Sequence, residues 1–319
     1  MSIQYSITHT TVYRYKKPVS FGEHRVMFRP RDSHDLRVLA TDLQVGPESI
    51  IRMIQDPHSN SVALVQPLSS ALELRIVCSF TIEHAHNYNL ELPVSKASEF
   101  FPFAYTPDER FDLEMYLRPH HEDPQGELMA WSRQFIRTDG PSRTRDLLVA
   151  MNEHIRNRLV YSSREEEGTQ SPLDTLKLGS GTCRDFALLM MEAARRLGVA
   201  TRFVSGYLYD PALDTDSSAP GSPDCPQVTQ GAGSTHAWLQ AYLPGAGWVP
   251  FDPTNNFLGG NQLIRVGVAR DPSQAAPVSG SWFGDPDAYA GMDASVTVRR
   301  VVAKPWYPTP PGATALPVV

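Results

Sequence analysis

The sequence has few cysteines, no large excess of charge of one sign and no long apolar run. Three cysteines in 319 residues are too sparse and too far apart for a disulfide framework. The formal net charge of −6 leaves no broad basic face, so we expect no nucleic-acid partner. No apolar run approaches the roughly 20 residues of a membrane span, and the first residues lack a signal pattern. We therefore expect a cytoplasmic protein with no membrane partner.

Each cysteine needs its own interpretation. Cys78 lies in an alternating, strand-like run, in phase with the apolar residues Leu74 and Ile76, which predicts a small apolar side chain facing a core. Cys225 lies in a loop rich in Gly, Ser, Pro and Asp, which predicts an exposed, incidental thiol. Only Cys183 stands where the start of a helix could activate it.

The first part of the chain is typical of β structure. Apolar and polar residues alternate with a period of two, and turn signals separate the runs. This spacing predicts an antiparallel β-sandwich over residues 1–93 that shapes the substrate site or serves the fold alone. The predicted strands are Gln4–Tyr15, His24–Arg29, Arg37–Val45, Ile50–Gln55, Ser61–Val65 and Ala71–His84.

The pattern changes from residue 94. Helical periodicity appears, and later runs are again typical of strands, which predicts an α+β domain over 94–304 followed by a Pro-rich tail over 305–319. Ser142 is the expected N-cap of the second helix, and Gly198 is expected to end the third. The predicted helices are Gln125–Thr138, Ser142–Leu159 and Cys183–Leu197, and the predicted strands are Ala200–Tyr209, His236–Tyr242, Trp248–Asp252 and Ser295–Val302.

A long loop, Asp210–Ser234, has no periodicity and leads directly to His236. Loops of this length in compact domains are usually functional lids or disordered insertions. We expect a mobile lid here. Deletion of its middle should then alter substrate affinity and leave the fold intact.

Cys183 is expected at the first turn of its helix. Thr182 is a good N-cap, and Asp185 three residues later completes a capping-box pattern. The positive end of the helix dipole would lower the pKa of the thiol, and the free N–H of Cys183 could donate to an oxyanion. A buried cysteine packed at a helix start is an equally good interpretation of this segment alone.

His236 and Asp252 lie at the two open ends of a predicted hairpin. Antiparallel pairing about the turn Pro244–Gly247 would bring them together, so that the carboxylate could orient the imidazole. Taken singly, His236 is more often a structural histidine, and Asp252 before a proline is a common turn residue. The hairpin is what makes the pair a candidate base and orienting group.

Other chemistries have weaker support. His84 and His86 could share a strand face, and residues 120–123 form a polar cluster, but neither has a third ligand at metal-binding spacing. A serine nucleophile elbow is absent. We therefore expect no metal and no cofactor.

Three separated stretches together resemble the transglutaminase-like superfamily of papain-type thiol enzymes, and residues 1–93 resemble the β domain that precedes this core in bacterial members. The resemblance implies a nucleophilic Cys183, a general-base His236 and an orienting Asp252. It also implies a cysteine helix packed on an antiparallel sheet. The stretches are Gly181–Ala187, Ser205–Tyr207 with Thr235–Trp238, and Gly247–Asn255.

The implied reaction is acyl transfer from a peptide, protein or small amide substrate through a thioester on Cys183. Hydrolysis by a protease or amidase is favoured because water is always present. Protein-glutamine transglutamination with an amine acceptor, or a non-catalytic binding module that keeps the fold, stays open. Two departures leave the substrate contacts undefined: Gln240 stands where the family often has an acidic residue, and the stretch 269–274 lacks a Tyr and a second Asp.

Overall fold

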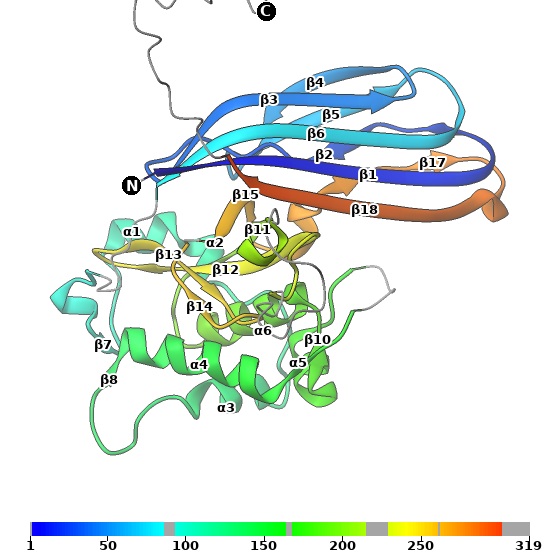
Figure 1. Ribbon diagram of the computed structural model, residues 1–319. Coiled ribbons are helices and arrows are strands. Elements are labelled where there is room, and N and C mark those ends of the chain that lie inside the picture. The colour runs from blue at the N-terminus through cyan, green and yellow to red at the C-terminus, as the bar shows by residue number, and fades with distance from the viewer. Residues whose placement is uncertain (1, 86–92, 164–167, 215–228, 261, 302–319) are drawn as a thin grey trace, which may run out of the picture.

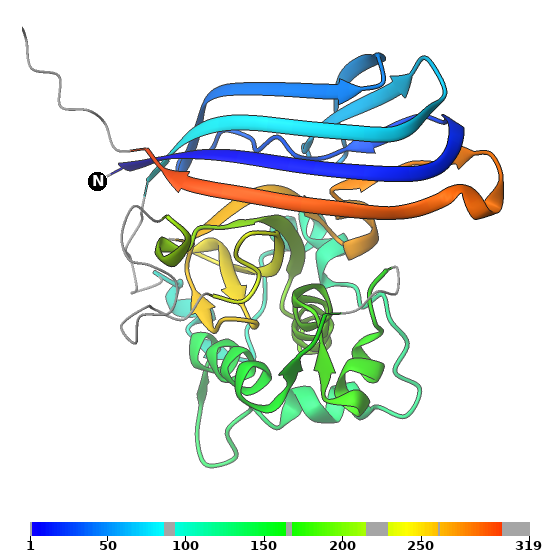
Figure 2. The same ribbon diagram turned by 45° about the vertical axis from the view of Figure 1, so that its right-hand side comes forward.

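A β-sandwich lies across a core of helices and sheet, as two views of the molecule show (Figures 1 and 2). The computed structural model describes residues 2–85, 93–163, 168–214, 229–260 and 262–301. The predicted thiol of Cys225, the middle of the expected lid and the tail 305–319 lie outside these residues. None of the described helices is both long and apolar enough to cross a membrane.

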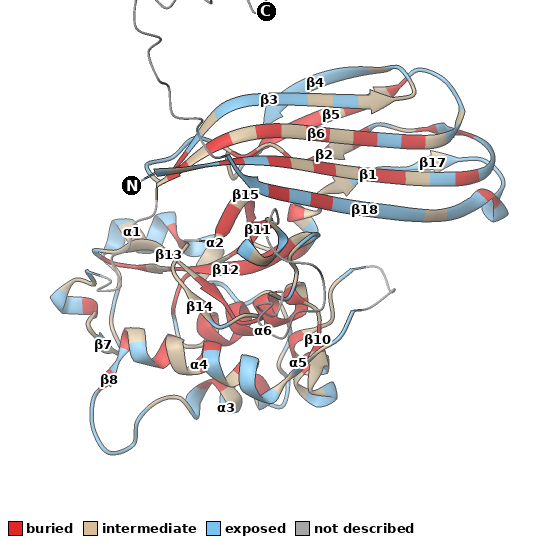
Figure 3. Ribbon diagram, viewed as in Figure 1, coloured by how far each residue is buried: buried red, intermediate tan, exposed pale blue. Residues whose placement is uncertain are grey.

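The first sheet of the sandwich is built around β1 (Ser2–Phe21). It has the order β17-β1-β6-β3, and β18 also pairs with β1. Tyr5, Ile7 and His9 are buried on one face of β1, as the period of two predicts. Figure 3 shows buried residues recurring along β1 and β6. The other strands are β3 (Leu36–Gly46), β6 (Ala71–Ala85), β17 (Trp282–Phe283) and β18 (Tyr289–Arg300).

The second sheet has the order β16-β2-β5-β4 and packs on the first. Its antiparallel ladders confirm the predicted sandwich. Cys78 is buried between the sheets as a small apolar residue, as its phase in the strand predicts. The strands are β2 (His24–Val26), β4 (Ser49–Gln55), β5 (Ser61–Pro67) and β16 (Val278–Ser279).

From Val278 onward the chain returns to the sandwich. β16 and β17 pair with β2 and β1, and β18 runs antiparallel along β1 from Tyr5 to Tyr15. The ladders place these late strands in the sheets of the N-terminal part, although the predicted domain over 94–304 includes them. That division of the chain stays a prediction.

The second part of the chain contains a five-stranded sheet, which we call the core sheet, in the order β14-β13-β12-β11-β15. One face carries helix α6 (Cys183–Arg196), whose Phe186, Met190 and Ala193 are buried against it. Figure 3 shows α6 as the most completely buried helix. The strands are β11 (Thr201–Leu208), β12 (Thr235–Leu243), β13 (Gly247–Asp252), β14 (Phe257–Leu258) and β15 (Leu263–Ala269).

The opposite face of the core sheet packs on the sandwich. Tyr207 and Ile264 belong to the same apolar cluster as the sandwich interior. A hydrogen bond of 2.9 Å joins His9 Nδ1 to Tyr207 Oη, and Asn60 donates to and accepts from the backbone of Val268. Residues of the core sheet therefore contribute to the apolar cluster of the sandwich, whereas α6 packs on the other face of the sheet in a second cluster.

Shorter elements surround α6. A parallel pair of two-residue strands, β9 and β10, leads into the turn before Cys183. Helices and short strands are α1 (Pro107–Asp112), α2 (Glu114–Leu117), α3 (Glu127–Arg133), α4 (Thr144–Arg158), α5 (Pro172–Leu178), β7 (Phe100–Phe101), β8 (Ser142–Arg143), β9 (Val160–Tyr161) and β10 (Ser180–Gly181). The 3₁₀ turns are η1 (Lys96–Ser98), η2 (Pro211–Leu213), η3 (Pro272–Ala275) and η4 (Pro286–Ala288).

The prediction that Ser142 caps a helix is wrong. Helix α4 begins at Thr144, with Arg143 at the N-cap and no side-chain cap. The Ser142 hydroxyl instead accepts a hydrogen bond of 2.8 Å from the backbone N–H of Arg137. It therefore closes the preceding turn, and Ser142 itself pairs with Phe101 in a short ladder.

Several predicted boundaries also differ from the structure, and three of them illustrate the differences. The helix predicted over Gln125–Thr138 is shortened to α3, the strand predicted from Ser295 begins at Tyr289, and the strand predicted over His24–Arg29 ends at Val26. The two strand ends depend on pairing partners far away in the sequence, which local periodicity does not contain.

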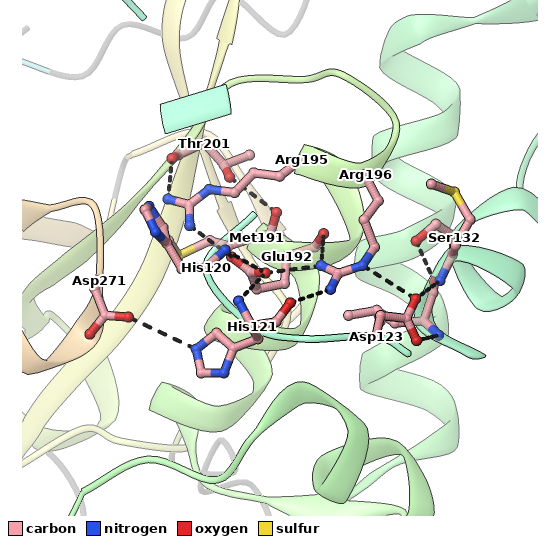
Figure 4. Close-up of polar contacts among 12 residues, drawn as sticks. His120, His121, Asp123, Ser132, Met191, Glu192, Arg195, Arg196, Thr201 and Asp271 are labelled. Atoms are coloured by element: carbon pink, nitrogen blue, oxygen red, sulfur yellow. Dashed lines mark hydrogen bonds and ion pairs between the residues drawn. The ribbon is translucent and has the colours of Figure 1, made fainter. Parts of the chain in front are cut away.

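A network of buried charges fixes the C-terminal half of α6 (Figure 4). Glu192 accepts from Arg195 at 2.8 Å and from Arg196 at 2.9 Å, and the backbone N–H groups of His120 and His121 donate to it. Arg196 also pairs with Asp123 at 3.4 Å. The polar cluster at 120–123 therefore anchors α6 to the segment that covers it. Among the described residues, no group of three or more His, Cys, Asp or Glu could hold a metal ion.

Candidate active site

The N-terminus of α6 has the predicted cap. Thr182 Oγ1 accepts from the N–H of Asp185, and Asp185 Oδ2 accepts from the N–H of Thr182 at 2.8 Å, so that the capping box is complete. Asp185 Oδ1 also accepts from the N–H of Gln170 at 2.8 Å. Gly181 leaves room for this carboxylate, because a Cβ there would lie 2.9 Å from the Asp185 Cβ. Cys183 is thereby fixed as the first helical residue.

Cys183 is only 7% exposed. Its backbone N–H lies in the first helical turn, where no intrahelical acceptor exists. The backbone N–H of Cys183 makes no hydrogen bond to another described residue. This N–H is therefore available to an oxygen atom placed beside the thiol.

The predicted hairpin is confirmed. β12 and β13 pair antiparallel, with Leu239 opposite Phe251 and Leu243 opposite Gly247. This brings the start of β12 beside the end of β13, where His236 Nε2 and Asp252 Oδ2 lie 2.8 Å apart. Both side chains are fully buried.

Asp252 is held as an anion by several donors. Its Oδ1 accepts from the N–H of Thr254 at 2.9 Å, and its Oδ2 accepts from Asn255 Nδ2 at 2.9 Å as well as from the histidine. Burial alone would raise the pKa of Asp252, but the charge of His236 and these hydrogen bonds lower it. The carboxylate can therefore orient the imidazole without taking its proton.

The imidazole of His236 is stabilised in its charged form. Burial opposes the charge, but the attraction and hydrogen bond of Asp252, together with the hydrogen bond and charge of Cys183, raise the pKa of His236 to about 10. Its second nitrogen, Nδ1, is buried and has no hydrogen-bond partner at ordinary distance among the described residues. The thiol of Cys183 is therefore near enough to affect the pKa of His236, but Nδ1 and the thiol do not meet the distance and angle criteria of a hydrogen bond. Such contacts are often long before substrate binds.

Asn255 is a site residue to which sequence reasoning gave no role. Its Nδ2 donates to Asp252 and, at 3.1 Å, to the carbonyl of Gln230, and its Oδ1 accepts from the Gln230 N–H at 3.2 Å. It therefore ties the end of the long loop to the carboxylate. The available signal was its position in Asp-Pro-Thr-Asn, three residues after Asp252, where Asn side chains commonly stabilise turns.

The segment before β12 covers the histidine. A Cβ at Gly231, whose φ is +88°, would lie 2.5 Å from His236 Nδ1. Glycine is needed here for both the backbone conformation and the space. The described end of the expected lid therefore touches the catalytic candidate. The central residues 215–228 lie outside the described part, so the lid stays a prediction.

The cysteine at a helix start beside a His–Asp pair on an antiparallel sheet defines a papain-like fold. Residues 130–253 match the transglutaminase-like superfamily, and residues 5–96 match the bacterial transglutaminase-like N-terminal region. The chain belongs to the transglutaminase-like superfamily and carries the N-terminal region of its bacterial members.

Relatives cover nearly the whole chain. An uncharacterised protein of Mycobacterium leprae is 27% identical over 296 residues, which is 92% of this chain and 98% of the relative. An uncharacterised protein of Mycobacterium tuberculosis is 26% identical over 320 residues, with 92% of each chain covered. The crystal structure of a candidate cysteine protease from Cytophaga hutchinsonii is 20% identical, with a TM-score of 0.66 over 97% of this chain and 95% of that one. This last likeness shows the fold.

Proposed function

We propose that the protein is a cysteine-dependent acyl-transfer enzyme that hydrolyses a peptide or carboxamide bond. Cys183 is the nucleophile, His236 the general base and acid, and Asp252 the orienting group. The observation that carries the proposal is the buried His236–Asp252 pair, whose remaining imidazole nitrogen is left for a cysteine at a capped helix start. The family membership and the fold support it.

The reaction proceeds in two halves. The Cys183 thiolate attacks the substrate carbonyl carbon, a C–S bond forms, and the oxyanion accepts from the backbone N–H of Cys183. The C–N bond then breaks, and the imidazolium of His236 gives its proton to the leaving amine. Water next attacks the thioester, His236 takes the water proton, and the carboxylic acid and thiolate separate.

A primary amine could replace water in the second half. The protein would then be a transglutaminase with the same three residues, so the alternative lies in the acceptor and not in the triad. Nothing in the site requires a metal or cofactor for either outcome. The proposed partner is a peptide, protein or small amide substrate.

Mass spectrometry of the acyl-enzyme tests the proposal directly. We expect wild-type protein, mixed with a peptide library and quenched in acid, to carry a covalent acyl group on Cys183. Release in water without amine incorporation identifies hydrolysis, whereas transfer to an added fluorescent primary amine identifies transamidation. Cys78→Ser, which changes the other described cysteine, is the matched control and should acylate normally.

Alkylation separates catalysis from simple binding. Iodoacetamide should label Cys183 faster than an ordinary free thiol at neutral pH, and His236→Ala should slow the labelling. An ordinary labelling rate that His236→Ala leaves unchanged would favour a non-catalytic module that keeps the fold.

A further inference from the structure

A cavity of about 580 Å³ lies between the sandwich and the core sheet. None of Cys183, His236 and Asp252 lines it, so it is distinct from the candidate active site. Its size is in the range of small-molecule sites in proteins. The polar groups that face it include Ser33, Asp35 and His84 from the sandwich and Arg202, Gln240 and Arg265 from the core sheet.

Arg202 is the unusual group in this lining. Its Nε donates to Gln240 Oε1 at 2.9 Å, and its guanidinium carbon lies 4.1 Å above the ring of Trp248. Among the described residues, no carboxylate lies within ion-pair distance of it. Burial, and then the charge of Arg265, lower the pKa of Arg202 to about 9. Arg202 is half-buried, and a partly desolvated cation whose hydrogen-bond partner is neutral is costly to keep.

The other buried arginines of the same core are paired differently. Arg195 and Arg196 both contact the carboxylate of Glu192, and Arg196 also reaches Asp123 (Figure 4). Arg195 and Arg196 are thus neutralised by carboxylates. Arg202 instead contacts the side-chain amide of Gln240, which has the shape of glutamate but carries no charge.

The second arginine increases the positive charge of the cavity. Arg265 donates to Ser33 Oγ at 3.0 Å and lies 3.8 Å from Asp35 Oδ1. Asp35 is the one carboxylate among the lining residues that the structure describes, and it is placed beside Arg265. Two guanidinium groups therefore face one described carboxylate, and the terminal N–H groups of Arg202 have no described acceptor.

We propose that this cavity binds a small molecule through a carboxylate or phosphate group, which pairs with the guanidinium of Arg202 and completes the charge balance with Arg265. The guanidinium fork matches both kinds of oxyanion, and Trp248 fixes its plane. Because the lining comes from both the sandwich and the core sheet, the bound molecule bridges them. The site is separate from the proposed thiol chemistry, and its test does not use activity.

Calorimetry and thermal unfolding of the full chain test the site. Sodium phosphate and sodium succinate are the two probes, each compared with sodium chloride at equal ionic strength. We expect saturable binding of one probe and a matching rise in Tm, because a ligand that binds only the folded state stabilises it. The probe that binds identifies the phosphate or the carboxylate source. If neither binds more tightly than chloride, the proposal is wrong.

Gln240→Glu is the decisive variant. It places a carboxylate against Arg202, so the Tm without ligand should rise and the affinity for the probe should fall by about ten-fold or more. Gln55→Glu, on an exposed strand that does not line the cavity, is the matched control and should bind as wild type does. Arg202→Gln should also abolish binding. Unchanged affinity in Gln240→Glu would overturn the proposal, even if Arg202→Gln fails to fold.

Discussion

At the scale of single residues, charge inside the site depends on pairs. His236 and Asp252 are buried together at 2.8 Å. The charge of each side chain stabilises the charged form of the other. The hydrogen bonds from Thr254 and Asn255 further stabilise the carboxylate of Asp252. Removing one partner would leave an uncompensated buried charge, which is far more costly than removing both.

The first prediction concerns pH. The pKa of His236 is raised from 6.5 to about 10 in the fold, so its charged form stabilises the folded state fully below about pH 6.5. This contribution is lost as pH rises toward 10. We expect the difference in free energy of unfolding between wild type and His236→Gln to shrink between about pH 7 and pH 10. Urea unfolding at several pH values measures it, and a constant difference would contradict the prediction.

The second prediction concerns Asn255. Asn255→Ala removes the donor to Asp252 Oδ2 and the tie to Gln230. Because the imidazole is then less well oriented, we expect kcat to fall on the order of ten- to a hundred-fold with little change in KM. Steady-state kinetics on the identified substrate measures it. Asn157→Ala on helix α4, an exposed asparagine, is the control and should keep wild-type kcat.

At the scale of elements, the capped start of α6 decides where the thiol lies. The capping box closes the turn before Cys183, and the buried apolar face of the helix holds it against β11 and β12. Any shift of α6 along its axis would therefore disrupt both the capping box and the apolar packing against β11 and β12. Its charged network at the other end adds a second anchor.

The third prediction tests this cap. Thr182→Ala should lower the free energy of unfolding by about 1 kcal/mol and also reduce alkylation and turnover at Cys183, because the first turn loosens. Thr106→Ala removes the equivalent capping box of α1 and is the matched control. In Thr106→Ala the free energy of unfolding should fall by a similar amount, and the activity should not change. Equal activity in the two variants would show that the cap is structural only.

At the scale of the whole molecule, the sandwich and the core sheet are not independent. The last strands of the chain complete the sandwich, and Tyr207 and Ile264 of the core sheet lie in the sandwich cluster. In the order of the chain, α6 and the core sheet therefore lie between two parts of the same sandwich. Isolated expression of residues 94–304 would leave β18 without its partner β1.

The fourth prediction follows from that closure. A chain ending at Pro277 loses β16, β17 and β18, and the N–H and C=O groups of β1 on that edge become unpaired. We expect it to aggregate or to unfold at a clearly lower Tm. A chain ending at Val301 keeps every described strand and is the control. Size-exclusion chromatography and thermal unfolding compare them, and equal stability would count against a closing role for β18.

Sequence reasoning reached much of this architecture because the signals were local. The capping box at Thr182, the burial of Cys78 and the hairpin that joins His236 to Asp252 all follow from patterns within about twenty residues. Ser142 was misplaced because its hydroxyl closes a turn that periodicity does not describe. The same limit applies to Asn255, whose partner Gln230 lies in another segment.

The sequence by itself determined the nature of the elements and the three candidate residues, because spacing, caps and turns are properties of the chain. Only the tertiary structure decided which groups meet. It placed the late strands beside β1, anchored α6 through Glu192, and placed half-buried Arg202 beside Gln240 with no carboxylate of the described residues at ion-pair distance. These pairings join segments far apart in the chain, and their energy comes from burial and charge that exist only once the chain has folded.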